Sequence, residues 1–427
     1  MALPSVFEVF QLAIGPSTVF TTGALRIGQA FREVLLSSPY RSNYRILIEL
    51  LGDFSKFGRE YNSDQAVIAG LAGFTLEETG MRLKTFYGKI KENGCFSFSG
   101  DIWPFNPESD LIFNDNTKKI AHQNCIRFHL LGSQGQPVFQ TEYHSIGNGL
   151  IKGIHTEDSK TIILENSPEC LSEIKEVITT EMISLMEYVI SGECSIHRIS
   201  RDQFQKRMLA TWKLMMANAD RGLKTMGSLN DRMDSNVTSM YKSYLAHLSA
   251  NPSAGSENTR ASIYALALSE EILNNHPVIT APTCSGSTIV PAVFRLIQEK
   301  FMLSEEKMVQ GLIVSGLFGS LILHQVNQSP QIFSWHSEVA ASAIMAAAGV
   351  TYLLGGSLNE IEKSASMATL LYGASCQKTS PFEPKSFLLL NTMVAQTLPA
   401  LTDLARIQPD GMIPKFDDTL KSLFRLQ

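Results

Sequence analysis

Alternating apolar and polar positions occur in short runs over the first 150 residues of the chain. Three runs are rich in β-branched and aromatic side chains and predict strands: residues 44–51, 125–131 and 137–146. Apolar residues at helical spacing lie between them, at residues 24–36 and 65–73. This mixture predicts an α/β domain over residues 1–154.

The pattern changes after residue 167, where apolar residues recur at helical spacing with little β-branched alternation. The longest such segments are residues 171–190 and 201–226. Ser304 and Ser357 each stand before acidic residues, as at capped helix starts. These patterns predict a nearly all-helical domain over residues 169–427, joined to the first by a polar linker, residues 155–168. The expected fold class is therefore α+β.

The amino-acid composition limits the classes of protein to which this chain can belong. Hydrophobic residues make up 44% and charged residues 18% of the chain, which is typical of a compact globular protein. The formal net charge of -5 provides no basic surface for nucleic acid, and no basic amphipathic stripe indicates membrane binding. The apolar segment of residues 311–323 is too short to span a bilayer and predicts a buried helix. Because the first ten residues lack a secretory pattern, we expect a cytoplasmic protein. The charge distribution favours a small-molecule or protein partner.

The six cysteines lie far apart in the sequence without any CxxC pair. Such spacing fits neither a disulfide framework nor a zinc site, so we interpret most of them as free, buried thiols. The residues interpreted as structural are Cys95, Cys125, Cys170, Cys194, His144 and His324.

Residues 14–28 read IGPSTVFTTGALRIG, a Gly-Pro turn followed by hydroxyl residues that lead into a helix. Backbone N–H groups and hydroxyls at a helix N-terminus suit an anion such as a substrate carboxylate. Ordinary helix capping by Ser17, Thr18 or Thr21 is the alternative. The motif alone does not decide between them.

A second hydroxyl-rich segment reads VITAPTCSGSTIVPAV over residues 278–293. We expect Cys284 in the first turn of a helix, where the helix dipole would lower the pKa of its thiol and make it nucleophilic. The alternative is a small residue packed where helices approach closely. If Cys284 is a nucleophile, backbone N–H groups around Ser285 to Ser287 would serve as an oxyanion hole.

Several blocks of sequence keep the order of a known family. They are SVFEVFQLAIGPS at residues 5–17, YHSIGNG at 143–149, TAPT at 280–283, IVPAV at 289–293, MAAAG at 345–349 and LLGGS at 353–357. Together they resemble the iron-sulfur dependent L-serine dehydratases, which convert L-serine to pyruvate and ammonia. The resemblance implies a β-chain-type domain followed by an α-chain-type helical domain, and a homodimer.

Two of the family's motifs differ here in the N-terminal domain. Phe20 stands where the family has a histidine, and Tyr61 and Asn62 stand at two further histidine positions. Gly58 and Asp64 keep the family's residues. The hydroxyls of Ser17 to Thr21 are still expected to contact ligand, because the corresponding family positions do so.

The cluster-binding positions also differ in this chain. By motif spacing, the family's three cluster cysteines fall near Trp335, near Cys376 or Gln377, and near Phe387 or Leu388, and its C-terminal cysteine has no counterpart. A four-iron four-sulfur cluster is held by thiolates and presents an open iron as a Lewis acid. We therefore expect a protein with no cluster, no metal and no other cofactor, for which serine dehydration is disfavoured.

A thiol mechanism is the leading hypothesis that follows. Cys284 would act as nucleophile and His336 as its base, for acyl transfer or cyclisation of an amino-acid-derived substrate. The residues expected to bind substrate are Ser17, Thr18, Thr21, Asp64, Thr283, Ser285, Ser287 and Glu338. Two alternatives stay open: a divergent ammonia-lyase acting on L-serine or another hydroxy amino acid, and an inactive paralogue that binds an amino acid or a partner subunit.

Overall fold

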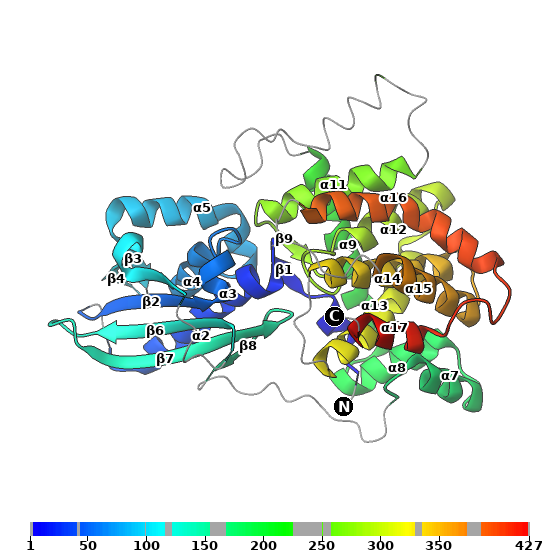
Figure 1. The fold of residues 1–427 in the computed structure, drawn as a ribbon, viewed down its shortest axis with the longest axis horizontal. Helices are drawn as coiled ribbons and strands as arrows, with labels where there is room; N and C mark the ends of the chain where they lie inside the picture. The colour runs from blue at the N-terminus through cyan, green and yellow to red at the C-terminus, as the bar shows by residue number, and fades with distance from the viewer. Residues whose placement is uncertain are drawn as a thin grey trace. The chain divides into compact units, whose positions relative to one another are not determined.

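The computed structural model describes residues 3–40, 43–98, 100–115, 122–153, 168–224, 250, 258–328, 335–373 and 386–425. The chain divides into two compact units (Figure 1). The sheet unit runs from Leu12 through β8 and includes Ile272–Pro277. The helical unit contains the segment that ends at Gln11 and the remaining helices. The expected α+β fold class is confirmed. The linker at residues 155–168 lies almost wholly outside the described residues, so its limits stay a prediction.

The sheet unit combines a mixed sheet with helices. Its elements are β1 (Leu12–Ile14), η1 (Thr18–Thr22), α2 (Gly23–Ser37), β2 (Arg45–Gly52), α3 (Asp53–Phe57), α4 (Ser63–Ala72), α5 (Leu76–Asn93), β3 (Cys95–Phe98), β4 (Asp101–Pro104), α6 (Pro107–Asp110), β5 (Leu111–Asn114), β6 (Asn124–Leu131), β7 (Pro137–Gly147) and β8 (Leu150–Gly153). The strand order of its five-stranded sheet is β5-β2-β6-β7-β8, with β2 parallel to β5 and the other pairs antiparallel.

Alternation in β2, β6 and β7 produces one apolar and one polar face, as the sequence predicted. Ile48, Phe128 and Tyr143 are buried, and the Phe128 ring stacks on Phe31 of α2 with centroids 4.1 Å apart. On the opposite face, the Arg127 guanidinium bridges Glu49 at 3.1 Å and Glu142 at 2.7 Å. Because successive side chains of a strand point to opposite faces, one register serves both the core and the ion-pair network.

Two glycines let α2 and α4 pack with their backbones in contact. A Cβ added to Gly28 would overlap the backbone oxygen of Val67, and one added to Gly70 would overlap that of Leu25. No side chain fits between the helices at these points, so glycine is required here for close approach and not for its backbone freedom.

Gly70→Ala should therefore destabilise the protein by about 1–3 kcal/mol or more, because overpacking forces the backbones apart. Gly88→Ala on α5 is the matched control, since no atom lies within 4 Å of its added Cβ. That change should be neutral or stabilise by up to about 1 kcal/mol through helix propensity. Chemical unfolding of both variants measures the difference, and equal stability would contradict the close-packing argument.

In the helical unit, the described residues form helices and one short strand. Its elements are α1 (Val6–Val9), α7 (Leu171–Thr180), α8 (Leu185–His197), α9 (Arg201–Lys224), α11 (Thr259–Leu273), β9 (Pro277–Ile279), α12 (Ile289–Phe301), α13 (Glu305–Gln328), α14 (Trp335–Leu353), α15 (Leu358–Gly373), α16 (Ser386–Ile407) and α17 (Phe416–Arg425). The single helix predicted over residues 171–190 is wrong. The chain turns between α7 and α8 at Met182, whose φ of 51° is left-handed and interrupts the helical hydrogen bonds.

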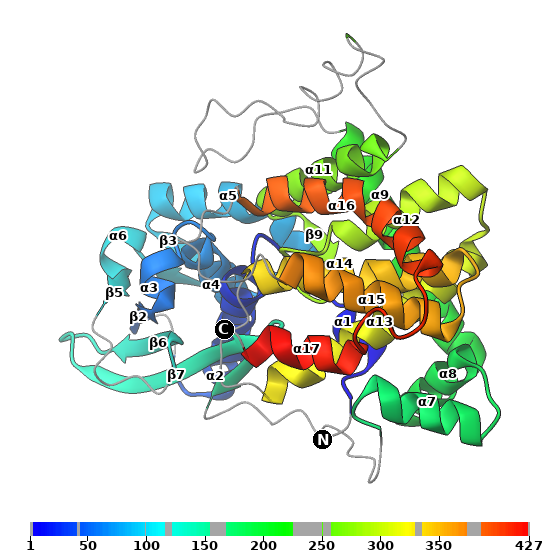
Figure 2. The same cartoon turned by 45° about the vertical axis from the view of Figure 1, so that its right-hand side comes forward.

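Helices α13 and α14 form the centre of this unit, and Figures 1 and 2 both show α14 beside α15. α13 is long and apolar enough to cross a membrane, but 83% of its apolar window is buried inside the protein, as the predicted core helix requires. Gly349 of α14 approaches α13 closely, since an added Cβ would lie 2.8 Å from the Gly311 oxygen. Small residues on facing helices thus bring the backbones of the core together.

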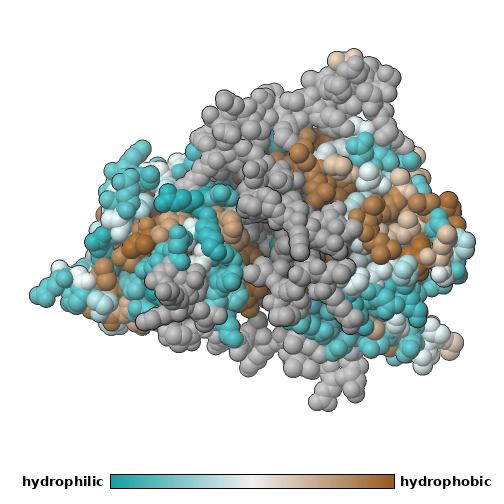
Figure 3. Space-filling model, viewed as in Figure 1, coloured by the Kyte–Doolittle hydropathy of each residue, from teal (hydrophilic) through white to brown (hydrophobic). Residues whose placement is uncertain are grey.

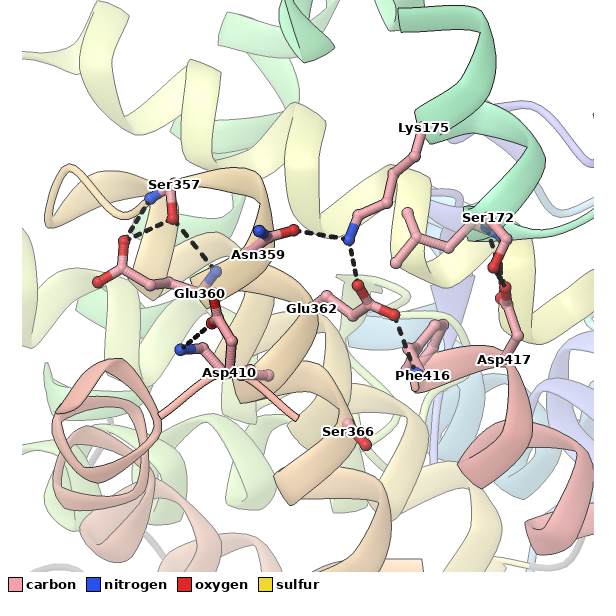
Figure 4. A network of polar contacts seen from close by, with 12 residues as sticks. Ser172, Lys175, Ser357, Asn359, Glu360, Glu362, Ser366, Asp410, Phe416 and Asp417 are labelled. Carbon is pink, nitrogen blue, oxygen red and sulfur yellow. Dashed lines mark hydrogen bonds and ion pairs between the residues drawn. The ribbon is translucent and has the colours of Figure 1, made fainter. Parts of the chain in front are cut away.

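Polar contacts at the helix ends tie α7, α15 and α17 together (Figure 4). Asp417 accepts hydrogen bonds from the Leu171 and Ser172 backbone N–H groups, both at 2.9 Å, and so caps α7. Lys175 pairs with Glu362, which also accepts from the Phe416 N–H at 3.2 Å. The two predicted helix starts hold as well, because Ser304 and Ser357 accept from the backbone N–H three residues on.

Apolar side chains are also exposed on the surface of α15 and α16. The brown surface over α16 in Figure 3 corresponds to this region. The exposed apolar residues are Leu370, Leu371, Leu389, Met393, Leu404 and Ile407. The homodimer expected from the resemblance stays a prediction.

Candidate functional site

In the sheet unit, the Ser17 hydroxyl serves as a helix cap. It accepts hydrogen bonds from the Val19 and Phe20 backbone N–H groups at 3.2 and 3.1 Å, at the start of η1. Ser17 therefore acts as an ordinary helix cap. Thr18 differs, because its hydroxyl is buried and has no hydrogen-bond partner among the described residues. Of these two residues, Thr18 is the better candidate to bind a polar ligand.

Two motifs that are 40 residues apart meet in this unit. The Thr21 hydroxyl donates to the Tyr61 carbonyl at 2.9 Å, and the Ser63 hydroxyl donates to the Phe20 carbonyl at 2.8 Å. The Phe20 and Tyr61 rings stack with centroids 4.9 Å apart. Thr21 thus contacts the segment that leads into α4, and the buried Asp64 lies in the first turn of that helix.

Asn62 immediately precedes α4 and has a left-handed backbone conformation, with φ 56°. Its side-chain amide donates to the Asn275 Oδ1 at 3.0 Å, and Asn275 donates in turn to the Gly15 carbonyl at 2.6 Å. Asparagine tolerates this backbone conformation better than most residues. The contacts link the start of α4 to the Gly-Pro turn, and nothing in the sequence spacing indicated Asn275.

The second hydroxyl-rich segment lies in the helical unit. Its residues 281–288, which include Cys284, form a loop before α12. The expectation that Cys284 starts a helix is wrong, because α12 begins at Ile289, five residues later. Cys284 is fully buried, and its carbonyl accepts from the Ser287 N–H at 3.1 Å and the Ser287 hydroxyl at 2.8 Å. The Cys284 thiol therefore lacks the helix-end position that was to activate it, and the Ser287 hydroxyl is occupied in forming the turn.

Glu338 is the buried acid of this region. It lies in the first turn of α14, and burial raises the pKa of its carboxyl group to about 7. The hydroxyls of Ser285 and Thr283 lower that pKa but do not offset burial. Of the two hydroxyls, that of Ser285 has the larger effect on the pKa.

The loop packs directly onto α14 at Gly286. A Cβ there would lie 2.6 Å from the Glu338 carbonyl oxygen and 2.8 Å from the Ser342 Cβ. From α16, the Asn391 side chain donates to the Ser285 carbonyl at 2.7 Å and fixes the other side of the loop. Three elements distant in sequence therefore hold the Ser285 hydroxyl next to the Glu338 carboxyl.

Four buried polar atoms of this loop and of helices α14 and α16 have no hydrogen-bond partner among the described residues. They are Thr283 Oγ1, Thr288 Oγ1, Ser342 Oγ and Asn391 Oδ1. Each unpaired buried polar atom lowers the stability of the folded protein by about 1–3 kcal/mol. Because four of them occur in one region, a polar ligand there is favoured. Sequence reasoning missed Ser342 and Asn391. Ser342 follows Glu338 by four residues, and this spacing could have placed both on one helix face.

The proposed pairing of Cys284 with His336 stays a prediction. His336 belongs to the first turn of α14, but its side chain lies outside what the structure describes. Cys376 lies outside the described residues as well.

Comparison with known proteins gives consistent matches along the chain. A model of the serine dehydratase beta chain matches residues 5–157, and one of the serine dehydratase alpha chain matches residues 172–376. The L-serine dehydratase of Haemophilus influenzae is 27% identical over 367 residues, covering 82% of this chain and 79% of its own. L-serine dehydratase 2 of Escherichia coli is 24% identical over 374 residues, covering 85% and 81%. These matches support a serine dehydratase-like function.

The expectation of a cofactor-free protein is overturned by the same matches, because iron-sulfur serine dehydratases imply a four-iron four-sulfur cluster. That expectation placed the ligands by motif spacing alone, and a shift of a few residues changes which side chain stands at a ligand position. Among the described residues, Phe387 and Leu388 are buried carbon side chains, and the cysteines are distributed over separate elements: Cys95, Cys125, Cys170, Cys194 and Cys284. The described part of the chain therefore does not identify the residues that would hold the cluster.

The two family matches follow the order of the two units, and the relatives align over about four fifths of their own length. The fold, with a small mixed sheet in the N-terminal part and helices in the C-terminal part, is consistent with a serine dehydratase-like fold. The chain belongs to the iron-sulfur serine dehydratase family.

Proposed function

We propose that this protein is an ammonia-lyase that eliminates water from a small β-hydroxy amino acid, L-serine or a close analogue, with Glu338 as the group that accepts the substrate proton. The observation that carries the proposal is the buried Glu338 carboxyl, whose pKa is raised to about 7. A group with a pKa near the working pH is present both as base and as acid, which general acid–base catalysis requires. Perturbed carboxyls of this kind are typical of functional sites.

The unpartnered atoms around Glu338 match the groups of an amino acid. The Thr288 and Ser342 hydroxyls can donate to a carboxylate, while Asn391 Oδ1 can only accept and suits an ammonium group. The Asn391 amide nitrogen is already occupied by the Ser285 carbonyl, which fixes the direction of its free oxygen. A zwitterionic ligand would thus find donors and an acceptor already oriented.

The reaction balances with Glu338 in this role. The Glu338 carboxylate takes the Cα proton, the electrons of the broken C–H bond form a Cα=Cβ double bond, and the Cβ–O bond breaks. The departing hydroxide leaves as water with the proton that Glu338 had taken up. The enamine product becomes an imine by moving one proton to Cβ, and water hydrolyses the imine to a 2-oxo acid and ammonia.

Purified protein given L-serine should release pyruvate and ammonia in equal amounts. Pyruvate is measured by reduction with lactate dehydrogenase, and ammonia by a separate assay. Binding of L-serine without product would favour the inactive paralogue over the lyase.

Substitution of Cys284 distinguishes the thiol mechanism from the proposed lyase. Cys284→Ala removes little volume from a buried site, so in the lyase it should keep the rate within a few fold and leave the fold intact. In the mechanism with Cys284 as nucleophile and His336 as base, the same change would abolish turnover. Circular dichroism serves as the folding control. A folded but inactive Cys284→Ala variant would reinstate acyl transfer or cyclisation.

A further inference from the structure

Three side chains of the types that bind metals, Cys125, Glu142 and His144, lie together on the polar face of the five-stranded sheet. Cys125 of β6 stands opposite His144 of β7 in the strand register, and Glu142 precedes His144 by two residues on the same face. One potential ligand atom from each of the three residues lies within 4.8 Å of the other two. From the sequence, Cys125 and His144 are both interpreted as structural, since the six cysteines lie far apart and show no zinc-site spacing.

The group borders a hollow of about 820 Å³ whose walls include His122, Glu142, His144 and Lys152. The Nδ1 atom of His144 is buried and has no hydrogen-bond partner among the described residues. Burial lowers the pKa of His144, with a smaller contribution from His122, so the imidazole is neutral and can bind a metal near neutral pH. An unpartnered ring nitrogen at the edge of a hollow is thus available as a ligand.

Contacts with Arg127 fix the orientation of the Glu142 carboxylate, with one oxygen directed toward Cys125. Its Oε1 atom accepts from Arg127 at 2.7 Å, and Arg127 is itself fixed by Glu49 at 3.1 Å. Its Oε2 atom faces the Cys125 sulfur at 3.9 Å. Outer contacts that orient a ligand in this way are usual at protein metal sites.

The Cys125 thiol keeps its proton in the structure as it stands. Burial raises the pKa of Cys125 to about 12, and the negative charge of Glu142 adds to the shift. A cation between the two groups would reverse both effects, because it displaces the thiol proton and offsets the carboxylate charge.

We propose that Cys125, Glu142 and His144 bind one divalent metal ion of the borderline-soft class, with Zn²⁺ the best match. Thiolate, carboxylate and imidazole are its three common ligand types, and two anionic ligands neutralise its charge. The ligand atoms at a tetrahedral zinc lie about 3.5 Å apart. The ligand atoms of these three residues would therefore have to move about 1 Å closer to one another. The fourth position faces the hollow and takes water. The His122 Nδ1 accepts from the Asn124 N–H at 3.1 Å, so its other ring nitrogen carries a proton and can donate to that water.

Cobalt(II) titration of the full-length protein tests the site without reference to activity. Wild-type protein should bind one Co²⁺ with a thiolate-to-cobalt charge-transfer band and the visible bands of tetrahedral cobalt, and Zn²⁺ should displace it. Cys125→Ser and His144→Ala should each lose the charge-transfer band or weaken binding by 100-fold or more. Cys194→Ser, in α8, is the matched control and should bind as the wild type does.

Thermal unfolding supplies a second readout that does not depend on the spectrum. Zn²⁺ should raise the unfolding temperature of the wild type and of Cys194→Ser, and leave that of a folded Cys125→Ser unchanged. Absence of a thiolate band in the wild type would overturn the proposal. So would an unchanged band in both Cys125→Ser and His144→Ala, which would assign the metal to another thiol.

Discussion

Replacing Glu338 with glutamine should lower the rate of pyruvate formation from L-serine by roughly 10²- to 10⁴-fold, the usual loss when a general base is removed. Glutamine keeps the length of the side chain and can still bond the Ser285 hydroxyl, so the fold should be retained. The wild-type rate should also rise as the pH passes about 7, because only the deprotonated carboxyl accepts the substrate proton. Initial rates measured across pH for both proteins provide the comparison.

Glu305→Gln is the matched control for this experiment. Glu305 is also an acidic residue in the first turn of a helix, α13, but it is exposed and pairs with Lys213 on the surface. Its replacement should leave the rate and its pH dependence unchanged. A Glu338→Gln variant that kept more than about a tenth of the activity would exclude the carboxyl as base.

The same substitution should change how stability depends on pH. The pKa of Glu338 is about 7 in the folded protein and 4.5 for the ordinary side chain, so folding favours the protonated form. This contribution to stability is complete below about pH 4.5 and is lost as the pH rises through 7. Between those limits the wild type should lose about 3 kcal/mol that Glu338→Gln does not lose.

Denaturant unfolding of both proteins at several pH values measures this difference, and subtraction of the two curves removes the titration of all other groups. The variant should gain stability relative to the wild type on going from acid to neutral pH. A flat difference curve would mean that the Glu338 carboxyl is not buried in solution, and the proton-transfer role would lose its support.

The elements of the sheet unit follow closely from the sequence pattern. The three predicted strands agree with β2, β6 and β7 within one residue at each end, and residues 24–36 fall inside α2. Each has a continuous apolar face, because it packs against one core. Alternation with period two or spacing near 3.6 is a local property of the chain, and burial of one face enforces it.

The errors occurred where a local pattern permits two outcomes. Residues 171–190 keep helical spacing throughout, yet Met182 turns the chain so that α7 and α8 become separate helices. Similarly, the hydroxyl-rich run around Cys284 resembles a helix start, but α12 begins only at Ile289. Both boundaries depend on which neighbours pack against the segment, and that information is not contained in its own spacing.

The sequence by itself therefore determined the family, the fold class and the two hydroxyl-rich segments, because these depend on motifs and periodicity that lie within short stretches of chain. Only the tertiary structure decided which polar groups are functional candidates. The pKa of Glu338 depends on burial beneath a loop more than 50 residues away, and the Asn391 oxygen is oriented by the Ser285 carbonyl. The pairing of Cys125 with His144 depends on strand register. Desolvation and register are set by residues distant in sequence, so no local pattern can reveal them.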